Sequence, residues 1–441
     1  MRHSAVKFVS CVSAAILSLT GCATQAVPSA DQGLAGTTNA APSCGTAGLT
    51  LPPGFCATVF ADSIGAARHL VVAANGDVFV ALQNARRSSR VAGIPAGAVG
   101  LRDTNGDGVA DLQQRFGSAG GTGIALHGDF LYADVGTAIV RYPKPAGPLT
   151  PTGAPDTVIK GIPSMPGHAA RNFAIARDGN LYVNVGSQTN ACQERDRQAG
   201  STGINPCAEL ERRAGIWRFD ANRLGQEFTP AARFATGIRN ATGLAINPAD
   251  GSLYAASHGR DNLSSNWPAL FTEQQNAELP AEELLRVTSG DDFGWPYCYW
   301  DGQRRMRVLA PEYGGNGTTV GQCSTKKANV SAMPAHWAPN ALMFYTGSMF
   351  PARYRGGAFI AFHGSWNRAP LPQGGYNVVF LPFPGGASSG AWEVFANGFV
   401  PADVQPATAP HRPAGVAQGP DGALYVTDDV GGRVWRITYR R

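Results

Sequence analysis

"FAIARDGNLYVNVG", residues 173–186, joins an apolar lead to an alternating run through the turn Asp178-Gly179. A tight β-hairpin turn needs a residue at positive φ, which glycine adopts without steric cost. The alternation after the turn is typical of a strand with one buried face. The stretch therefore predicts a β-hairpin.

The same pattern recurs along the chain and indicates the architecture. Five further copies occupy residues 71–82, 124–135, 244–259, 354–364 and 415–429, with turn glycines at Gly76, Gly128, Gly251, Gly357 and Gly422. Six unequally spaced hairpins predict an all-β six-bladed β-propeller of four-stranded antiparallel blades, with long loops on one face. A β-sandwich is the rival architecture, but it would rarely repeat one turn so often. We expect a single domain over residues 49–441, with "FCATVF" (55–60) as the closing strand.

Composition agrees with a large β-rich core. The 441 residues are 44% hydrophobic and 15% charged, with 55 Gly and 31 Pro. The formal net charge of +5 is small for this length, so we expect no nucleic-acid partner.

The N-terminus predicts export. Residues 1–22 carry Arg2 and Lys7, a short apolar run and "LTGC", which resembles a bacterial lipobox with Cys22 as the lipidated residue. A plain cleaved signal peptide is the alternative. Residues 23–48 are expected to form a flexible tether. A periplasmic or outer-membrane-anchored protein follows, with no membrane contact beyond its N-terminal lipid anchor.

The remaining cysteines predict disulfides. Six cysteines allow fifteen pairings, but their short separations favour Cys44–Cys56, Cys192–Cys207 and Cys298–Cys323. A zinc site is the weaker alternative, because no paired Cys or His spacing accompanies them.

Polar segments border the repeated hairpins, where a propeller would gather them at the mouth of its central channel. They hold His168 and five arginines: Arg68, Arg239, Arg260, Arg368 and Arg412. One arginine alone is most simply a solvated surface charge. Five at equivalent blade positions indicate a polyanionic ligand held by bidentate hydrogen bonds.

These segments carry a family resemblance. "GHAARNFAIARDGNLYVNVGSQTN" (167–190), "GIRNATGLAINPADGSLYAASHGRDN" (237–262), "EELLRVTSGDDFGWP" (282–296), "HGSWNR" (363–368) and "HRPAGVAQGPDGALYVTDD" (411–429) resemble successive motifs of the soluble quinoprotein glucose/sorbosone dehydrogenases. That family is built on six-bladed propellers and uses pyrroloquinoline quinone, a tricarboxylate. The match is closer to the sorbosone and aldose branch.

The resemblance implies roles for particular residues. His168 matches the general base that takes the proton of the sugar hydroxyl. The cofactor site takes Arg68, Gln188, Arg239, Asn240, Arg368 and Arg412. The backbone carbonyls of Gly259 and Arg260 match a calcium site beside the cofactor.

The chain also departs from the family pattern at three positions. Asn367-Arg368 stands where the glucose enzymes carry a lysine, Ala414 replaces an arginine, and Gly121 replaces a substrate-side glutamine. Arg368 is expected to substitute for the lysine.

A separate motif predicts a second calcium site. "RDTNGDGVAD" (102–111) offers oxygen ligands on alternate residues around Gly108: Asp103, Asn105, Asp107, the carbonyl of Val109, and Asp111. Gln114 stands where a complete EF-hand has Glu. The alternative is an Asp/Asn/Gly turn without metal.

The sequence thus supports two functions. The first is an exported enzyme that uses pyrroloquinoline quinone and Ca²⁺ to oxidise a sugar, and passes electrons to a cytochrome or a quinone. The second is a propeller that has lost its cofactor and serves as a binding or scaffold protein. Retention of His168, Arg239 and Asn240 favours the enzyme.

Overall fold

The computed structural model describes residues 44–85, 89–144, 147–164 and 166–440. The expected export signal, Cys11, Cys22 and residues 23–43 of the tether lie outside the described residues. The compact unit runs from Cys44 to Arg441. Residues 44–48, expected in the tether, therefore belong to this unit. There the Ala57 N–H donates to the Gly45 carbonyl at 2.9 Å.

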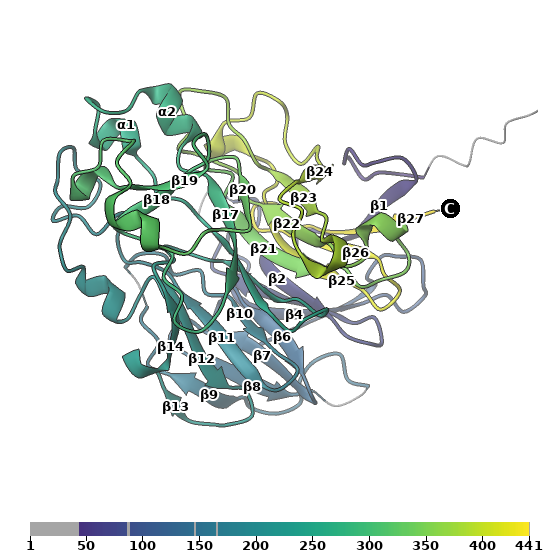
Figure 1. The fold of residues 1–441 in the computed structure, drawn as a ribbon. Coiled ribbons are helices and arrows are strands. Elements are labelled where there is room, and N and C mark those ends of the chain that lie inside the picture. The colour runs from purple at the N-terminus through teal and green to yellow at the C-terminus, as the bar shows by residue number, and fades with distance from the viewer. Residues whose placement is uncertain (1–43, 86–88, 145–146, 165, 441) are drawn as a thin grey trace, which may run out of the picture. The chain divides into compact units, whose positions relative to one another are not determined.

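The unit is a six-bladed β-propeller with four-stranded antiparallel blades, as the repeated hairpins predicted (Figure 1). Blade one contains β2 (Ala66–Val72), β3 (Val78–Gln83), β4 (Gly97–Arg102) and β5 (Leu112–Phe116). Blade two contains β6 (Ile124–His127), β7 (Phe130–Asp134), β8 (Ile139–Pro143) and β9 (Asp156–Lys160), extended in parallel by β13 (Gln226–Glu227). Blade three contains β10 (Phe173–Ile175), β11 (Asn180–Val185), β12 (Gly215–Asp220) and β14 (Arg233–Thr236).

The other three blades complete the ring. Blade four contains β15 (Gly243–Ile246), β16 (Leu253–Ser257), β17 (Glu282–Val287) and β20 (Ser331–Met333). Blade five contains β21 (Pro339–Phe344), β22 (Ala358–Phe362), β23 (Asn377–Leu381) and β24 (Glu393–Ala396). Blade six contains β25 (Pro413–Gln418), β26 (Leu424–Asp428), β27 (Val434–Tyr439) and β1 (Phe55–Ala61). The first strands, β2, β6, β10, β15, β21 and β25, contact one another in ring order around the axis.

Loops between the strands carry the remaining elements. The helical segments are short. The α-helices are α1 (Leu263–Asn266) and α2 (Glu273–Glu278). The 3-10 helices are η1 (Ala208–Glu211), η2 (Pro230–Ala232), η3 (Pro311–Tyr313), η4 (Gly321–Thr325), η5 (Ala352–Tyr354), η6 (Pro384–Gly386) and η7 (Pro406–Thr408). A two-stranded ribbon of β18 (Cys298–Asp301) and β19 (Met306–Leu309) lies in the long insertion of blade four, near α1 and α2 in Figure 1.

The last blade closes the ring by pairing the two ends of the domain. β1 runs antiparallel to β27, with Phe55 opposite Tyr439 and Val59 opposite Trp435. The closing strand expected at residues 55–60 is therefore confirmed. Phe55 and Trp435 are both buried in the core between blades five and six, so closure also buries apolar surface.

Five of the six predicted turn glycines take positive φ, between 54° at Gly128 and 91° at Gly76. The prediction was wrong at Gly357, because β21 and β22 are joined by the longer segment 345–357. There the neighbouring Gly356 has the positive φ, of 80°. A Cβ on Gly357 would lie 2.3 Å from Cε2 of Phe380. Packing against that ring, rather than a tight turn, requires glycine at position 357.

All three predicted disulfides are present. The Cα atoms lie 5.4 Å apart in Cys44–Cys56, 6.2 Å apart in Cys192–Cys207 and 5.8 Å apart in Cys298–Cys323. In the chain-entropy description, loops of this size stabilise the folded state by about 3 kcal/mol each. The second and third bridges fix long insertions on blades three and four.

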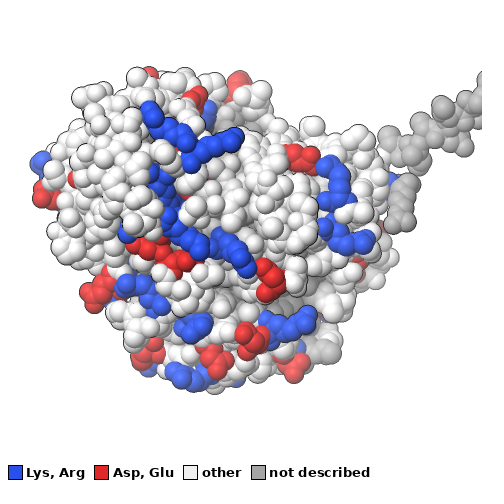
Figure 2. All heavy atoms as spheres, in the orientation of Figure 1, with Lys and Arg blue, Asp and Glu red and all other residues white. Residues whose placement is uncertain are grey.

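Charge is sparse on the surface of the propeller. On the face in Figure 2, a diagonal band of Lys and Arg is bordered by Asp and Glu, and most other atoms are uncharged. Within the described ranges, no helix has the length and apolar character needed to cross a membrane.

Candidate functional site

A polar cavity of about 550 Å³ lies where the loops of blades three, four and five meet. The lining residues are His168, Arg197, Arg239, His258, Gly259, Asp261, Glu282, His336, Ala338, Gly364, Trp366 and Asn367. We call it the axial cavity. An adjoining hollow of about 730 Å³ shares His258, Ala338, Gly364 and Trp366 with it and extends to His363 and Arg412.

His168 enters the axial cavity from the loop before β10. Its backbone N–H donates to the Ser187 carbonyl at 3.0 Å, and its Nδ1 lies 2.9 Å from the same oxygen. This contact places the ring proton on Nδ1, which leaves Nε2 as the basic nitrogen. Among the described residues Nε2 has no hydrogen-bond partner. Burial, followed by the charge of Arg239, lowers the pKa of His168 to about 3, so the imidazole is neutral near pH 7.

Glycine at position 186 lets His168 reach this place. A Cβ on Gly186 would lie 2.6 Å from the Cβ of His168 and 2.8 Å from Oδ1 of Asn240. The side chain of Asn240 contacts blade three, where its Oδ1 accepts from Asn184 at 3.3 Å. Asn240 is buried and does not line the axial cavity.

Arg239 is the buried cation of the axial cavity, and protein oxygens surround its guanidinium. Nε donates to the carbonyl of Asn190 at 3.1 Å, and Nη1 to the carbonyl of Gly259 at 2.7 Å. Nη2 donates to Oδ1 of Asn190 at 3.0 Å and to Oδ2 of Asp261 at 2.9 Å. The sequence did not single out Asn190 as the residue that orients this arginine.

Asp261 pairs with a second arginine at the rim. Arg197, on the loop closed by Cys192–Cys207, donates from Nη2 to Oδ2 of Asp261 at 2.9 Å. Burial opposes ionisation of Asp261, but Arg239 and Arg197 outweigh it and hold the pKa of the carboxyl well below its usual range. The axial cavity therefore holds one carboxylate between two guanidinium groups.

Two further groups on the cavity wall are buried. Glu282 accepts from the backbone N–H groups of Gly259 at 2.8 Å and Ala338 at 2.9 Å. Burial raises the pKa of Glu282 to about 8 despite these hydrogen bonds. Nε2 of His336 lies 2.7 Å from the carbonyl of Asn276. Sequence analysis missed both residues. Glu282 belongs to a quoted motif, whereas no local pattern marks His336.

Arg412 lines the adjoining hollow from blade six. Its Nε donates to the carbonyl of His363 at 2.8 Å and its Nη2 to the carbonyl of Gly364 at 2.6 Å. His363 contacts Asp429 through Nε2 at 2.8 Å. Arg68 also binds Asp429, at 2.9 Å. Arg412 thus reaches the mouth, whereas Arg68 is buried under it.

The expected convergence of the arginines is only partly correct. Arg239 and Arg412 line the two cavities, but Arg68 lines neither. Arg368 donates to the carbonyls of Pro372 at 2.9 Å and Ala277 at 2.5 Å, so it does not take the place of the family's lysine in the cavity. Its neighbour Asn367 lines the axial cavity instead. The carbonyl of Ala277 belongs to a distant part of the sequence, so sequence spacing could not show that it binds the Arg368 guanidinium.

Gln188 was also expected in the cofactor site. Its side chain is exposed, and only its backbone N–H is fixed, by Glu209. Two residues further along, Asn190 is buried and reaches Arg239. The strand end therefore supplies the site through Asn190.

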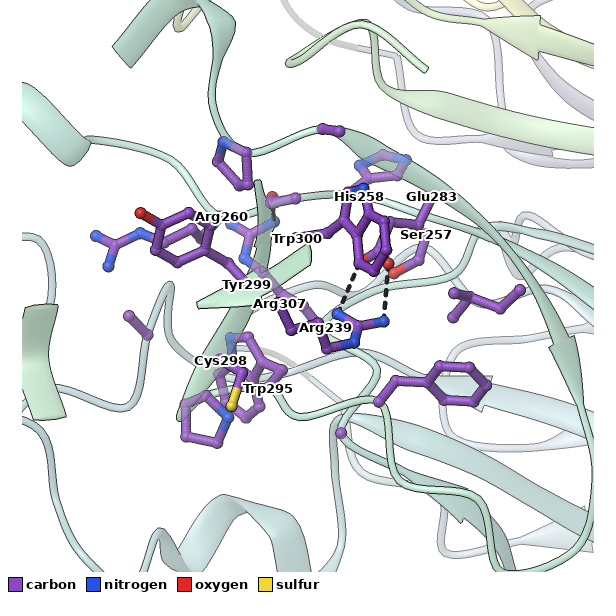
Figure 3. Close-up of a pocket in the computed structure, with 18 residues that line it drawn as sticks. Arg239, Ser257, His258, Arg260, Glu283, Trp295, Cys298, Tyr299, Trp300 and Arg307 are labelled. Carbon is purple, nitrogen blue, oxygen red and sulfur yellow. Dashed lines mark hydrogen bonds and ion pairs between the residues drawn. The ribbon is translucent and has the colours of Figure 1, made fainter. Parts of the chain in front are cut away.

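Of the two residues expected to bind calcium, Gly259 lines both the axial cavity and a second cavity of about 460 Å³, and Arg260 lines the second cavity (Figure 3). The carbonyl of Gly259 accepts from Arg239, and the side chain of Arg260 pairs with Glu312 at 2.5 Å. Figure 3 shows Arg239, His258 and Arg260 around the second cavity with Trp295, Tyr299 and Trp300. Three polar atoms of its lining, Arg260 Nη2, Tyr299 Oη and Trp300 Nε1, have no partner among the described residues.

The loop at residues 102–111 joins β4 to β5 on the outside of blade one. Asp103 accepts from the N–H groups of Gly106 at 2.7 Å and Gly108 at 2.8 Å, and Asp107 accepts from that of Val109 at 2.8 Å. Asn105 accepts from the N–H of Asp107, and both carboxylate oxygens of Asp111 accept from Thr104. The acidic and amide oxygens thus fold back on their own loop. Among the described residues, no group of three or more His, Cys, Asp or Glu is arranged to hold a metal.

Comparison with known proteins identifies relatives of this chain. It is 26% identical over 281 residues to an uncharacterised protein of Borreliella burgdorferi, covering 62% of this chain and 61% of that protein. It is 27% identical over 320 residues to a pyrroloquinoline quinone-dependent pyranose dehydrogenase of Coprinopsis cinerea, covering 61% of this chain and 39% of the relative. The matches therefore span less than two thirds of either relative.

Solved structures share the fold. The quinone-binding domain of the Coprinopsis cinerea pyranose dehydrogenase superposes with a TM-score of 0.69 at 20% identity, covering 88% of this chain and 97% of that one. A Trichoderma reesei protein of carbohydrate-active enzyme family AA12 gives a TM-score of 0.72 at 18% identity, covering 90% and 99%. A family model described as TrAA12-like matches residues 49–440. This chain therefore belongs to the TrAA12-like family.

Proposed function

We propose that this protein is an exported dehydrogenase that oxidises a sugar with pyrroloquinoline quinone as cofactor. The observation that carries the proposal is the state of His168: a neutral imidazole with its Nδ1 proton fixed on Ser187 and its Nε2 free in a polar cavity. Membership of the TrAA12-like family and similarity to a pyranose dehydrogenase support the same chemistry.

The residues at the mouth fit a planar polyanion. Arg197, Arg239 and Arg412 line the connected cavities. Arg260, which lines the neighbouring cavity, has an Nη2 without a partner in the described part of the chain. Guanidinium groups bind carboxylates through charge-assisted hydrogen bonds. Arg239 and Arg412 are the residues we assign to the cofactor carboxylates, with Asn240 supporting the base of the site. When bound, the quinone supplies a two-electron acceptor.

The calcium assignment rests on oxygen chemistry. Gly259 lines both the axial cavity and the second cavity, and Arg260 lines the second. Their backbone carbonyls are the oxygens that we assign to Ca²⁺, which prefers such ligands. A cation there would polarise the cofactor as a Lewis acid. The loop at residues 103–111 remains a separate candidate calcium site on the outside of blade one.

His168 performs the protein's own chemical step. Its Nε2 accepts the proton from the anomeric hydroxyl of the bound sugar, while the hydrogen on the same carbon leaves with its electron pair for the oxidant. Ser187 keeps the imidazole oriented, because its carbonyl oxygen accepts the Nδ1 proton throughout. General-base assistance of this kind typically contributes 10²- to 10⁴-fold to a rate.

Export and electron delivery complete the proposal. Three disulfides support an oxidising compartment, which agrees with the export signal predicted for residues 1–22. We propose a periplasmic or lipid-anchored location, with electrons passed to a cytochrome or a quinone. An aldose or a sorbosone-type sugar aldehyde is the proposed substrate.

One observation favours the alternative of a non-enzymatic binding propeller. The donors of Arg239 are already engaged by Asn190, Gly259 and Asp261, so a polyanion has to compete with protein oxygens for this guanidinium.

The deciding experiment adds pyrroloquinoline quinone and Ca²⁺ to the purified chain and records the absorption spectrum, followed by sugar-dependent reduction of a dye. We expect a bound chromophore and turnover. No bound chromophore would favour the binding propeller.

A further inference from the structure

We propose that Trp366 is the platform on which the ring of a pyranose substrate stacks at the entrance of the axial cavity. The inference rests on the proposed function, because it assigns the sugar to the same cavity. Trp366 follows β22 on blade five, and it lines both the axial cavity and the adjoining hollow.

The exposure of Trp366 is the first observation. Half of its surface, 50%, is open to solvent. A solvated indole forgoes the free energy that burial of its apolar area would contribute. Together with its place on a cavity wall, this exposure indicates a surface kept for a ligand.

The second observation is that the loop holds Trp366 from both sides. Ser365 Oγ donates to Gln373 at 2.6 Å, and the Tyr376 hydroxyl donates to the Ser365 carbonyl at 2.8 Å. On the other side, Asn276 donates to the Asn367 carbonyl at 2.8 Å. The backbone on each side of the indole is therefore fixed before any ligand arrives, which lowers the entropic cost of binding.

The third observation is the chemistry beside the ring. The Arg197 guanidinium lies over the Trp366 ring, 5.7 Å from its centre, and Asp261 and Asn262 hold that guanidinium in place. The part of the indole that remains exposed lies next to these fixed hydrogen-bonding groups, an arrangement that matches a pyranose. Such a sugar presents C–H groups on its face and hydroxyls at its edge. Hydroxyls that reach Arg197 or Asp261 would place the ring within the cavity that holds His168.

The test separates ring stacking from turnover. The probes are methyl β-D-glucopyranoside and the corresponding galactoside and mannoside, which have no free anomeric hydroxyl, with sorbitol as an open-chain control. Binding is measured by calorimetry and by saturation-transfer NMR on the full chain, before and after loading with quinone and Ca²⁺. The variants are Trp366→Ala and Trp366→Phe. Val394→Ala, which changes another exposed apolar residue on the outermost strand of blade five, is the matched control.

We expect Trp366→Ala to weaken binding of at least one methyl pyranoside by about fivefold and to leave sorbitol unchanged, since stacking on one aromatic ring contributes about 1 kcal/mol. Trp366→Phe should recover most of the affinity, and Val394→Ala should match the parent protein. Failure of all three glycosides to bind, or equal affinity in Trp366→Ala, would overturn the inference. Weaker binding of the quinone with unchanged binding of the glycosides would overturn it too, because the indole would then stack on the cofactor.

The same data distinguish this inference from the proposed function. If the protein binds pyranosides through Trp366 but never reduces a dye, the stacking role of Trp366 is supported and the dehydrogenase proposal fails. If the protein reduces a dye and its KM for sugars is unchanged in Trp366→Ala, the dehydrogenase proposal is supported and the stacking role fails.

Discussion

The two sides of the channel mouth contain the same residue types in different hydrogen-bonding arrangements. On the His168 side, Asp261 lies between Arg239 and Arg197, and His168 touches only oxygens of Ser187. On the Arg412 side, Asp429 binds Arg68 and also accepts directly from His363. Burial, followed by a neighbouring arginine, lowers the pKa of His168 and of His363 alike to about 3. His363 is hydrogen-bonded to a carboxylate through Nε2, whereas His168 is hydrogen-bonded to neutral oxygens through Nδ1 and its Nε2 has no partner among the described residues.

The largest effect should come from breaking the Arg412 side. Asp429→Ala leaves Arg68 and His363 buried without their carboxylate, and such a loss typically lowers the free energy of unfolding by about 3 to 5 kcal/mol. Chemical denaturation measures the change. Asp62→Ala, which removes a half-exposed partner of Arg433, is the control and should change stability by about 0.5 kcal/mol or less. Equal effects of the two variants would show that the buried Asp429 network contributes no more to the free energy of unfolding than the half-exposed Asp62–Arg433 pair.

Removal of His168, the proposed general base, should lower the reaction rate rather than the stability of the fold. His168→Ala is expected to lower kcat by about 10²-fold or more while the quinone stays bound, because proton removal loses its base. Steady-state dye reduction and the bound-cofactor spectrum measure the two quantities. His127→Ala, on β6, serves as the control. A His168→Ala protein with the parent kcat would refute the assignment of the base.

The pH dependence of stability should carry the signature of His168. Its folded pKa is about 3 and its ordinary pKa is 6.5, so between these values the unfolded chain binds more protons. The free energy of unfolding therefore rises with pH across this window. The stabilising contribution of His168 is fully present above about pH 6.5 and is lost as the pH falls towards 3.

The variant His168→Gln should reduce this slope without abolishing it, because burial also lowers the pKa values of His69, His258, His336 and His363. Because His168 is partly exposed, we expect its contribution to be no more than about 2 kcal/mol. Urea unfolding at about pH 4.5 and about pH 7.5 measures the slope. An identical slope in His168→Gln and the parent protein would mean that the imidazole is as easily protonated in the folded state as in the unfolded chain.

The smallest effect should separate two arginines that the sequence treats alike. Arg412→Ala should weaken quinone binding about tenfold, because one charge-assisted contact is lost. Arg368→Ala should change the affinity less than about twofold, since its guanidinium is held by backbone carbonyls outside the cavity. Titration of the quinone absorbance measures both affinities. A stronger effect at Arg368 would restore the role that the sequence suggested for it.

The sequence by itself determined the propeller, its closing strand and its disulfides. Hairpin turns with glycine, such as Gly179, and alternating strands are local signals, because turn geometry and the two faces of a strand depend on adjacent residues. Closure could be read from the apolar strand at 55–60 and the strand-like C-terminus. Gly357 was misread because its requirement is tertiary: the ring of Phe380 occupies the space that a side chain would need.

Only the tertiary structure decided the composition of the candidate site. The sequence placed His168, Arg239 and Arg412 beside inner strands, but a guanidinium is long enough to reach several partners, and nearby carbonyls decide which one it takes. Arg368 turned to Ala277, and Asn190 rather than Gln188 reached Arg239. Arg197 and His336 come from loops without a repeat, and Trp366 follows the repeat at residues 354–364. Their meeting depends on how insertions from different blades pack over one axis, and no local pattern encodes that packing.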